Sequence, residues 1–200
     1  FRLAPESVPT RRNYFYQNAK DANTYGVEVE LRKNLRFLGG GESELLSNFS
    51  LFANFTYIFS QVKFDDELLG KVVSADRPVQ GQSPYLVNGG LTYSSKTSGW
   101  NGTLLYNRVG SRLALVGYQA LGFADIYENP RDVLDIQVSK RVFNKKGEIK
   151  LSVNDLLNQS LLYYENMNDN RKYDKGTDRV FSSFKPGSTI TVGFTYDFDL

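Results

Sequence analysis

The sequence predicts an all-β protein whose antiparallel strands cross a membrane as part of an up-and-down β-barrel. Three observations support this fold class. Apolar and polar residues alternate with period two in segments of roughly ten residues, short turns alternate with long connections, and aromatic residues are frequent. The 13 tyrosines and 14 phenylalanines contrast with one tryptophan and one methionine. This composition favours strands over helices.

The alternation defines about eight strands, in segments of roughly ten residues. In the cleanest one the apolar residues Ile190, Val192 and Phe194 alternate with small polar residues. Phe52 and Ile58 interrupt an otherwise polar face in another. The expected strands, of which the first is the weakest, are 11–18, 24–33, 48–60, 85–93, 100–110, 132–140, 148–154 and 189–198.

The connections between these segments differ systematically in length. Residues 38–42, 94–99 and 144–147 are rich in Gly, Ser, Asn and Lys, which is turn chemistry. Three other connections are long, and they fall between the short ones: 64–84, 113–130 and 160–186. In an up-and-down barrel this places all long connections at one end, as in bacterial outer-membrane proteins.

Aromatic residues gather near the ends of the proposed apolar rows. Rings at the lipid–water boundary are typical of membrane barrels, so this face is expected to meet lipid. The outward aromatic residues are Tyr25, Tyr57, Phe59, Tyr85, Tyr93, Tyr106, Tyr196 and Phe198. The opposite face carries small and polar residues and is expected to face a watery lumen or a plug.

Composition excludes several classes of function. The formal net charge of +2 indicates no nucleic-acid partner. The absence of histidine and cysteine removes imidazole-based catalysis and the usual zinc sites. No apolar run reaches the length of a membrane-spanning helix, about 18 residues. Neither an enzyme, a metal nor a cofactor is therefore expected.

The chain ends on a pattern that resembles the assembly signal of bacterial outer-membrane barrels. Thr191, Gly193, Tyr196 and Phe198 occupy its polar, glycine and two aromatic places in order. Two residues follow Phe198, whereas the family pattern ends on the aromatic residue. The resemblance implies that the barrel assembly machinery recognises this strand.

Further stretches resemble the C-terminal strands of TonB-dependent receptors, particularly those of Bacteroidetes-type bacteria. Each is short, but together they cover most of the chain in a consistent order. They are Tyr25-Gly26-Val27-Glu28-Val29-Glu30-Leu31, Arg77-Pro78-Val79-Gln80-Gly81-Gln82-Ser83-Pro84-Tyr85, Leu105-Tyr106-Asn107-Arg108-Val109-Gly110-Ser111-Arg112, and the pair Arg131-Asp132-Val133-Leu134-Asp135 and Lys150-Leu151-Ser152-Val153-Asn154-Asp155-Leu156-Leu157-Asn158.

The resemblance implies a fragment of a barrel of about 22 strands in the outer membrane of a Gram-negative bacterium. Residues 1–200 would form the C-terminal part of the barrel, with the N-terminal plug domain and the TonB box outside this sequence. Its expected partners are outer-membrane lipid, the plug, TonB and an imported nutrient. Siderophore, cobalamin, glycan and peptide cargoes stay open, and no ligand-binding residue is assigned.

Other candidate sites are better explained as ordinary loops, turns or lumen contacts than as functional sites. Residues 165–178 are rich in oxygen ligands for Ca²⁺, but they lack EF-hand spacing and include three cations, which favours a solvated loop. The glycines at 39–41 lack the Lys-Ser/Thr of a phosphate loop. Glu28 and Glu30 share a face with Arg32, which favours a lumen network over acid–base chemistry. The loop aromatics either stack on a ligand or anchor strands: Tyr118, Phe123, Tyr127, Tyr163, Tyr164 and Tyr173.

The sequence leaves three alternatives to the receptor. The first is a complete small outer-membrane barrel with a structural or adhesive role, although its interior would need large side chains. The second is an outer-membrane enzyme, which the absence of histidine opposes. The third is a soluble β-sandwich, which would have no reason to place all long connections at one end.

Overall fold

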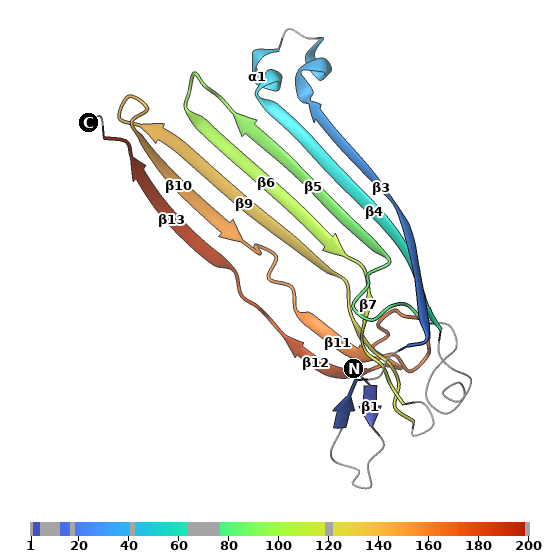
Figure 1. Cartoon of the computed structure of the whole chain (residues 1–200). Helices are drawn as coiled ribbons and strands as arrows, with labels where there is room; N and C mark the ends of the chain where they lie inside the picture. The colour runs from blue at the N-terminus through green and yellow to red at the C-terminus, as the bar shows by residue number, and fades with distance from the viewer. Residues whose placement is uncertain are drawn as a thin grey trace.

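The fold is described by a computed structural model that covers residues 2–4, 13–16, 19–40, 43–63, 77–118 and 122–198. Strands dominate it (Figure 1). The helical elements are the 3-10 helix η1 (Leu35–Gly39) and the short helix α1 (Glu44–Ser47), which lie together in one connection. Within the described residues, no helix is long and apolar enough to cross a membrane.

The main sheet has seven antiparallel strands in the order β13-β10-β9-β6-β5-β4-β3. Two steps in this order skip numbers, because the chain leaves the sheet after β6 and after β10 and returns one hairpin later. The strands are β3 (Asp21–Asn34), β4 (Phe49–Lys63), β5 (Tyr85–Ser94), β6 (Trp100–Val109), β9 (Arg131–Val142), β10 (Gly147–Asn154) and β13 (Thr189–Tyr196). Seven of the predicted segments are thereby confirmed as strands.

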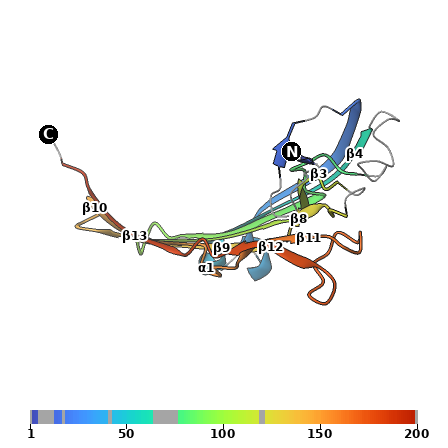
Figure 2. The ribbon, with the colours of Figure 1, turned by 90° about the horizontal axis from the view of Figure 1, so that it is seen from below.

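The sheet is curved like a section of a tube wall (Figure 2). All its strands run between the same two ends (Figure 1). The connections β3–β4, β5–β6 and β9–β10 lie at one end, here called the short-turn end. The other end, here called the long-connection end, carries the longer excursions of the chain.

A second sheet of four strands continues the main sheet at the long-connection end. Its order, β12-β11-β8-β7, repeats the order β13-β10-β9-β6, because each of its strands extends one strand of the main sheet. Its members are β7 (Arg112–Leu115), β8 (Ile126–Glu128), β11 (Leu161–Glu165) and β12 (Arg179–Phe184). The expectation that 113–130 and 160–186 are loops was therefore wrong, because both fold into hairpins that pair with each other.

Two other predictions need correction. Residues 11–18 do not add an eighth strand to the main sheet: β2 (Asn13–Phe15) pairs with β1 (Arg2–Ala4) in a separate two-stranded sheet. The turn expected at 38–42 belongs to a longer connection, in which Asn34 and Ser43 cap η1 and α1 with their side chains. Local capping stabilises these helices without help from a strong periodicity.

The main sheet is open. Among the described residues, β3 pairs with β4 alone and β13 with β10 alone, so the two outermost strands do not meet. A complete small barrel requires its first and last strands to pair. The geometry gives the small-barrel alternative no support and instead fits one section of a wider wall.

Candidate functional site

One face of the main sheet forms a continuous apolar surface. The register aligns Tyr25 with Phe59, Tyr57 with Tyr85, and so on across the sheet, so that apolar rows of all seven strands coincide. Its largest exposed members are Tyr25, Val27, Val29, Leu31, Leu51, Phe55, Tyr57, Phe59, Leu104, Val138, Ile149, Leu151, Ile190, Val192, Phe194 and Tyr196. A soluble sheet would cover such a surface, so this face requires an apolar solvent.

The height of this apolar surface matches a bilayer. From Phe49 to Phe59 in β4 the chain advances about 33 Å at about 3.3 Å per residue. A strand tilt of about 40° reduces this to about 25 Å, the height of the apolar band in outer-membrane barrels. At both ends of these apolar rows, the next residues on the same face are polar or charged. Lys140 lies over the ring of Trp100 at the short-turn end, and Arg108 pairs with Asp132 at the other.

The opposite, concave face carries a chain of side-chain amides. Asn107 donates to Asn88 at 2.6 Å, Asn88 to Asn54 at 3.5 Å, and Asn54 to the carboxylate of Glu28. The four residues come from four adjacent strands, β6, β5, β4 and β3. Glu28, which was expected to form a network with Glu30 and Arg32, accepts at the end of this amide chain, whereas Arg32 donates to Glu30. This face suits water, a polar plug or a polar solute.

Two apolar residues on the concave face are accommodated by glycines. Phe52 lies opposite Gly90 and Ile58 opposite Gly26 in the register. A Cβ on Gly90 would lie within 2.0 Å of the Phe52 ring, so the ring occupies the space that a side chain would need. The exceptions in the polar pattern therefore pack flat on the wall and do not fill the lumen.

The second sheet has its own hydrophobic core. Leu113, Tyr127 and Tyr164 are almost fully buried, and Tyr173 packs its ring 5.3 Å from that of Tyr164. Burial raises the pKa of Tyr127 to about 12, so its phenol stays neutral at all physiological pH values. Tyr127 and Tyr164 therefore anchor strands and are not available to stack on a ligand.

A buried ion pair ties this core to the chain before β5. The Arg77 guanidinium donates to Asp125 at 2.8 Å, with only 2% and 7% of the two residues exposed. Asp125 also accepts the backbone N–H of Gly117 at 2.7 Å. Burial raises the pKa of Asp125 and lowers that of Arg77, because desolvation outweighs their mutual attraction. Burying the pair costs desolvation free energy, so the loss of either partner would leave an uncompensated charge in the interior.

Two of the acids in the loop 165–178 accept hydrogen bonds from the loop's own backbone. Asp178 accepts the backbone N–H groups of Met167 at 2.9 Å and Asp174 at 2.8 Å. Asp174 accepts that of Gly176 at 2.8 Å. No group of three or more metal-ligating acids, histidines or cysteines gathers in the described part of the chain. Asp174 and Asp178 therefore cap backbone, which is the structural alternative to Ca²⁺ for these two residues.

Sequence reasoning missed the cross-strand ion pairs at the long-connection end. Arg108 bonds Asp132 at 2.6 Å, and Asp132 also accepts the Tyr106 hydroxyl at 2.6 Å. Arg112 binds Glu128 through two hydrogen bonds, at 2.8 and 3.1 Å. The signal was available in part, because Arg108 and Asp132 lie in two of the stretches that resemble receptor strands. Only the register between β6 and β9 makes them partners.

The residues of the C-terminal pattern occupy an edge strand. Thr191 and Gly193 lie on the concave face of β13, while Tyr196 belongs to the apolar rows. Phe198 packs its ring 4.9 Å from that of Tyr196 and is highly exposed. Phe143 completes an aromatic cluster 6.0 Å from Tyr196. A free edge and a ridge of rings therefore coincide at the short-turn end.

The class of protein follows from this arrangement. A curved antiparallel sheet with a lipid-height apolar outside and a hydrogen-bonded polar inside is a section of an outer-membrane β-barrel wall. Residues 3–156 match the family model described as TonB dependent receptor-like, beta-barrel. The chain belongs to that family, and it lies in the outer membrane of a Gram-negative bacterium.

Solved structures support the fold. The ferric citrate transporter FecA in its unliganded form aligns over 86% of this chain and 24% of its own, with 14% identity and a TM-score of 0.59. The ferric yersiniabactin uptake receptor FyuA from Yersinia pestis aligns over 91% of this chain and 24% of its own, with 16% identity and a TM-score of 0.59. The chain thus spans about a quarter of the length of either. No curated protein matches the sequence.

The receptor family and the transmembrane β fold are confirmed, and membership places the chain among receptors rather than enzymes. The Bacteroidetes type stays a prediction, since the family model does not distinguish it.

Proposed function

We propose that this chain is the C-terminal part of the barrel wall of a TonB-dependent receptor that imports a scarce nutrient. The observation that carries the proposal is the two-sided sheet, apolar outside and polar inside over all its strands. The concave amide chain from Asn107 to Glu28 would then face an N-terminal plug and the nutrient. In this proposal TonB acts on the plug and not on these residues.

Cysteine accessibility in the full-length receptor tests which face is which. The sequence contains no cysteine, so single substitutions can be read without background from this region. Asn88→Cys on the concave face and its neighbour Val87→Cys on the apolar face form a matched pair. A membrane-impermeant maleimide should label the Asn88→Cys protein once the plug is deleted and should spare Val87→Cys in lipid. Equal labelling of both positions would contradict the assignment of one face to lipid and the other to the lumen.

Nutrient class is tested by growth. Both solved neighbours are named for ferric chelates, so ferric siderophores and ferric citrate are the first compounds to supply, followed by cobalamin, glycans and peptides. A strain that lacks the receptor should fail to grow on one scarce nutrient, and a strain that lacks TonB should fail likewise. Growth of both strains on every class would refute the import function.

We also propose that Thr191, Gly193, Tyr196 and Phe198 are read by the barrel assembly machinery. The free edge of β13 and the exposed Phe198 ring support this role. Phe198→Ala should lower the amount of receptor in the outer membrane several-fold, whereas Phe181→Ala on β12 should leave it unchanged. Equal amounts of both proteins in the outer membrane would show that the C-terminal pattern is not an assembly signal.

A further inference from the structure

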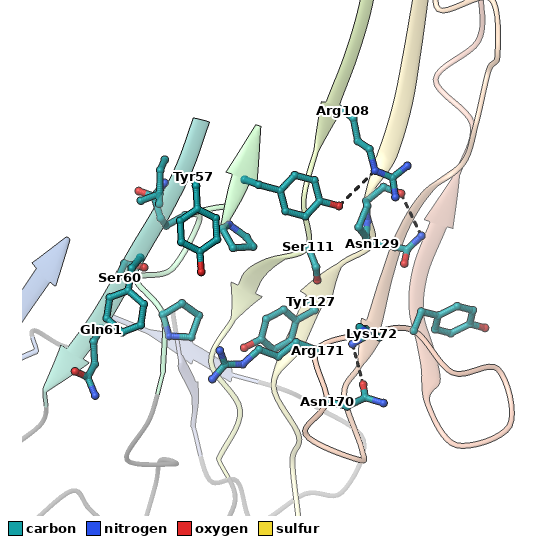
Figure 3. A pocket seen from close by; sticks show the side chains of 18 residues that line it. Tyr57, Ser60, Gln61, Arg108, Ser111, Tyr127, Asn129, Asn170, Arg171 and Lys172 are labelled. Atoms are coloured by element: carbon teal, nitrogen blue, oxygen red, sulfur yellow. Dashed lines mark hydrogen bonds between the residues drawn. The ribbon is translucent and has the colours of Figure 1, made fainter. Parts of the chain in front are cut away.

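The two ends of the apolar rows are built differently. At the long-connection end the second sheet continues the wall, and a cavity of about 800 Å³ lies between β4 and that sheet (Figure 3). Its lining draws on both faces of β4, because Tyr57 and Ile58 both contribute. At the short-turn end no further sheet of the described residues follows. The rows of β3 and β4 there meet the connection that holds η1 and α1 (Figure 1).

This connection exposes three large apolar side chains. Phe37, Leu38 and Leu45 keep 56%, 62% and 62% of their surface exposed. The β5–β6 turn at the same end, residues 95–99, contains only Ser, Lys, Thr and Gly. A turn that faces water carries single exposed apolar residues at most, whereas three in one short connection indicate an apolar neighbour.

The fold of the connection holds these side chains outward. A Cβ on Gly39 would lie 3.0 Å from a side-chain carbon of Leu46, so η1 and α1 pack closely at this glycine. The side chain of Asn34 donates to the carbonyl of Ser47 at 2.7 Å, which ties α1 back to β3. Leu46 is therefore half-buried, whereas its neighbour Leu45 is exposed.

Two pairs of an aromatic ring and an ammonium mark where the lipid-facing rows end. On β3, Lys33 follows Leu31 on the apolar face, and its ammonium lies 5.4 Å from the centre of the Phe37 ring. At the same end of the sheet, the Lys140 ammonium lies 4.9 Å from the centre of the Trp100 ring. Rings next to basic groups are typical of the boundary between acyl chains and headgroups. Phe37 therefore continues the lipid-facing surface at the level of the headgroups.

We propose that the η1–α1 connection lies on the inner leaflet of the outer membrane, with Phe37, Leu38 and Leu45 between phospholipid acyl chains. Short turns of outer-membrane barrels face the periplasm, so the inner leaflet is the lipid surface at this end. Interfacial helices place their apolar residues about 5–10 Å deep in such a surface. The Lys33 ammonium, beside the Phe37 ring, contacts headgroup phosphates. This contact requires the membrane wall alone and does not depend on which nutrient is imported.

Fluorescence quenching in the full-length receptor tests the contact, in vesicles of phosphatidylethanolamine and phosphatidylglycerol. Leu38→Cys, Leu45→Cys and a control in the β5–β6 turn, Thr97→Cys, each carry one fluorophore, with any other cysteine of the receptor replaced. Lipids with a nitroxide near the top of the acyl chain should quench the fluorophore at both leucine positions about threefold or more than at the control. Iodide on both sides of the vesicle should give the opposite order.

A variant of the apolar residues tests the cause of the quenching. Phe37→Asp/Leu45→Asp should lower lipid quenching at Leu38→Cys about threefold or more and raise iodide quenching, because the connection leaves the lipid. Glu44→Gln changes an exposed polar residue of α1 and should leave both values unchanged. Equal lipid quenching with and without the two aspartates would overturn the proposal.

The same vesicles separate lipid from a periplasmic protein as the neighbour of these side chains. They contain no such protein, so lipid is the apolar partner present. If iodide quenches Leu38→Cys and Leu45→Cys as strongly as Thr97→Cys, the connection faces water in the absence of a protein, and the proposal is wrong.

Discussion

The strands of the two sheets follow the same order, but one sheet leaves its apolar residues exposed and the other buries them. The seven-stranded sheet leaves its apolar residues uncovered, with Val192 exposed to 73%, whereas the four-stranded sheet buries Tyr164 completely. The strands are continuous in order from one sheet to the other, so chain direction does not explain the difference. The difference lies in the surroundings. Lipid covers the apolar residues of the first sheet, whereas the second sheet lies in water and buries its apolar residues in a core of its own.

Polar contacts differ in the same way. The main sheet arranges them as a flat network of amides across four strands, from Asn107 to Glu28. At the second sheet the polar contacts are ion pairs, with Arg112–Glu128 between two of its strands and the buried pair Arg77–Asp125 beside it. The membrane part is therefore held by strand pairing and lipid, while the outer part is held by tertiary packing. Substitutions should therefore affect the two parts through different physical terms.

The largest effect is expected at the buried pair. Asp125→Ala leaves the Arg77 guanidinium buried without its partner, which costs about 3–5 kcal/mol. Hydrogen exchange in the full-length receptor should become faster over β7, β8 and β11 and stay unchanged over β3 to β5. Arg32→Ala, which breaks an exposed pair with Glu30, should cost at most about 1 kcal/mol. Unchanged exchange in Asp125→Ala would show that the pair does not hold this sheet.

The next effect separates lipid from water on adjacent positions of β4. Phe55→Arg places a charge near the middle of the apolar rows and should cost about 2–4 kcal/mol. Thr56→Arg, one residue later on the concave face, should cost much less because water reaches it. Urea unfolding of the receptor in lipid vesicles measures both variants. A larger loss for Thr56→Arg would mean that the faces are assigned the wrong way round.

A smaller effect is expected where Phe52 lies over Gly90. Gly90→Val displaces the ring and should cost about 1–3 kcal/mol through overpacking. Gly89→Ala is the control, because its new Cβ meets its nearest neighbour, the backbone oxygen of Phe52, only at 3.9 Å. The same unfolding assay reads both. Removal of the ring in Phe52→Ala/Gly90→Val should recover part of the loss, and no recovery would refute the packing explanation.

The smallest effect appears only in alkaline solution. The pKa of Tyr127 is raised to about 12 by burial, so the folded state keeps a proton that the unfolded chain releases near pH 10. The stability contributed by this group is complete below about pH 10 and is lost as the pH rises toward 12. Phenolate absorbance, compared between the receptor and Tyr127→Phe, measures the titration. Ionisation of Tyr127 near pH 10 would show that it is not buried.

Much of the main sheet was predictable from local pattern. The rows of β3, β4 and β13 follow from alternation alone, since each residue of a strand faces opposite its neighbours. Phe52 and Ile58 were recognised as exceptions, but their explanation needed Gly90 and Gly26 on neighbouring strands. The hairpins in 113–130 and 160–186 were missed, because their strands are only three to six residues long and carry little periodicity.

The sequence by itself determined which residues of each long strand share a face and that one of those faces is apolar, because a period of two is a local property. Tertiary structure alone decided the pairing of Arg77 with Asp125, 48 residues apart, and the approach of Lys172 to Tyr57 around one cavity. Such contacts depend on strand order and register, which no single segment encodes. The physical reason is that burial and charge compensation are properties of neighbours in space, not of neighbours along the chain.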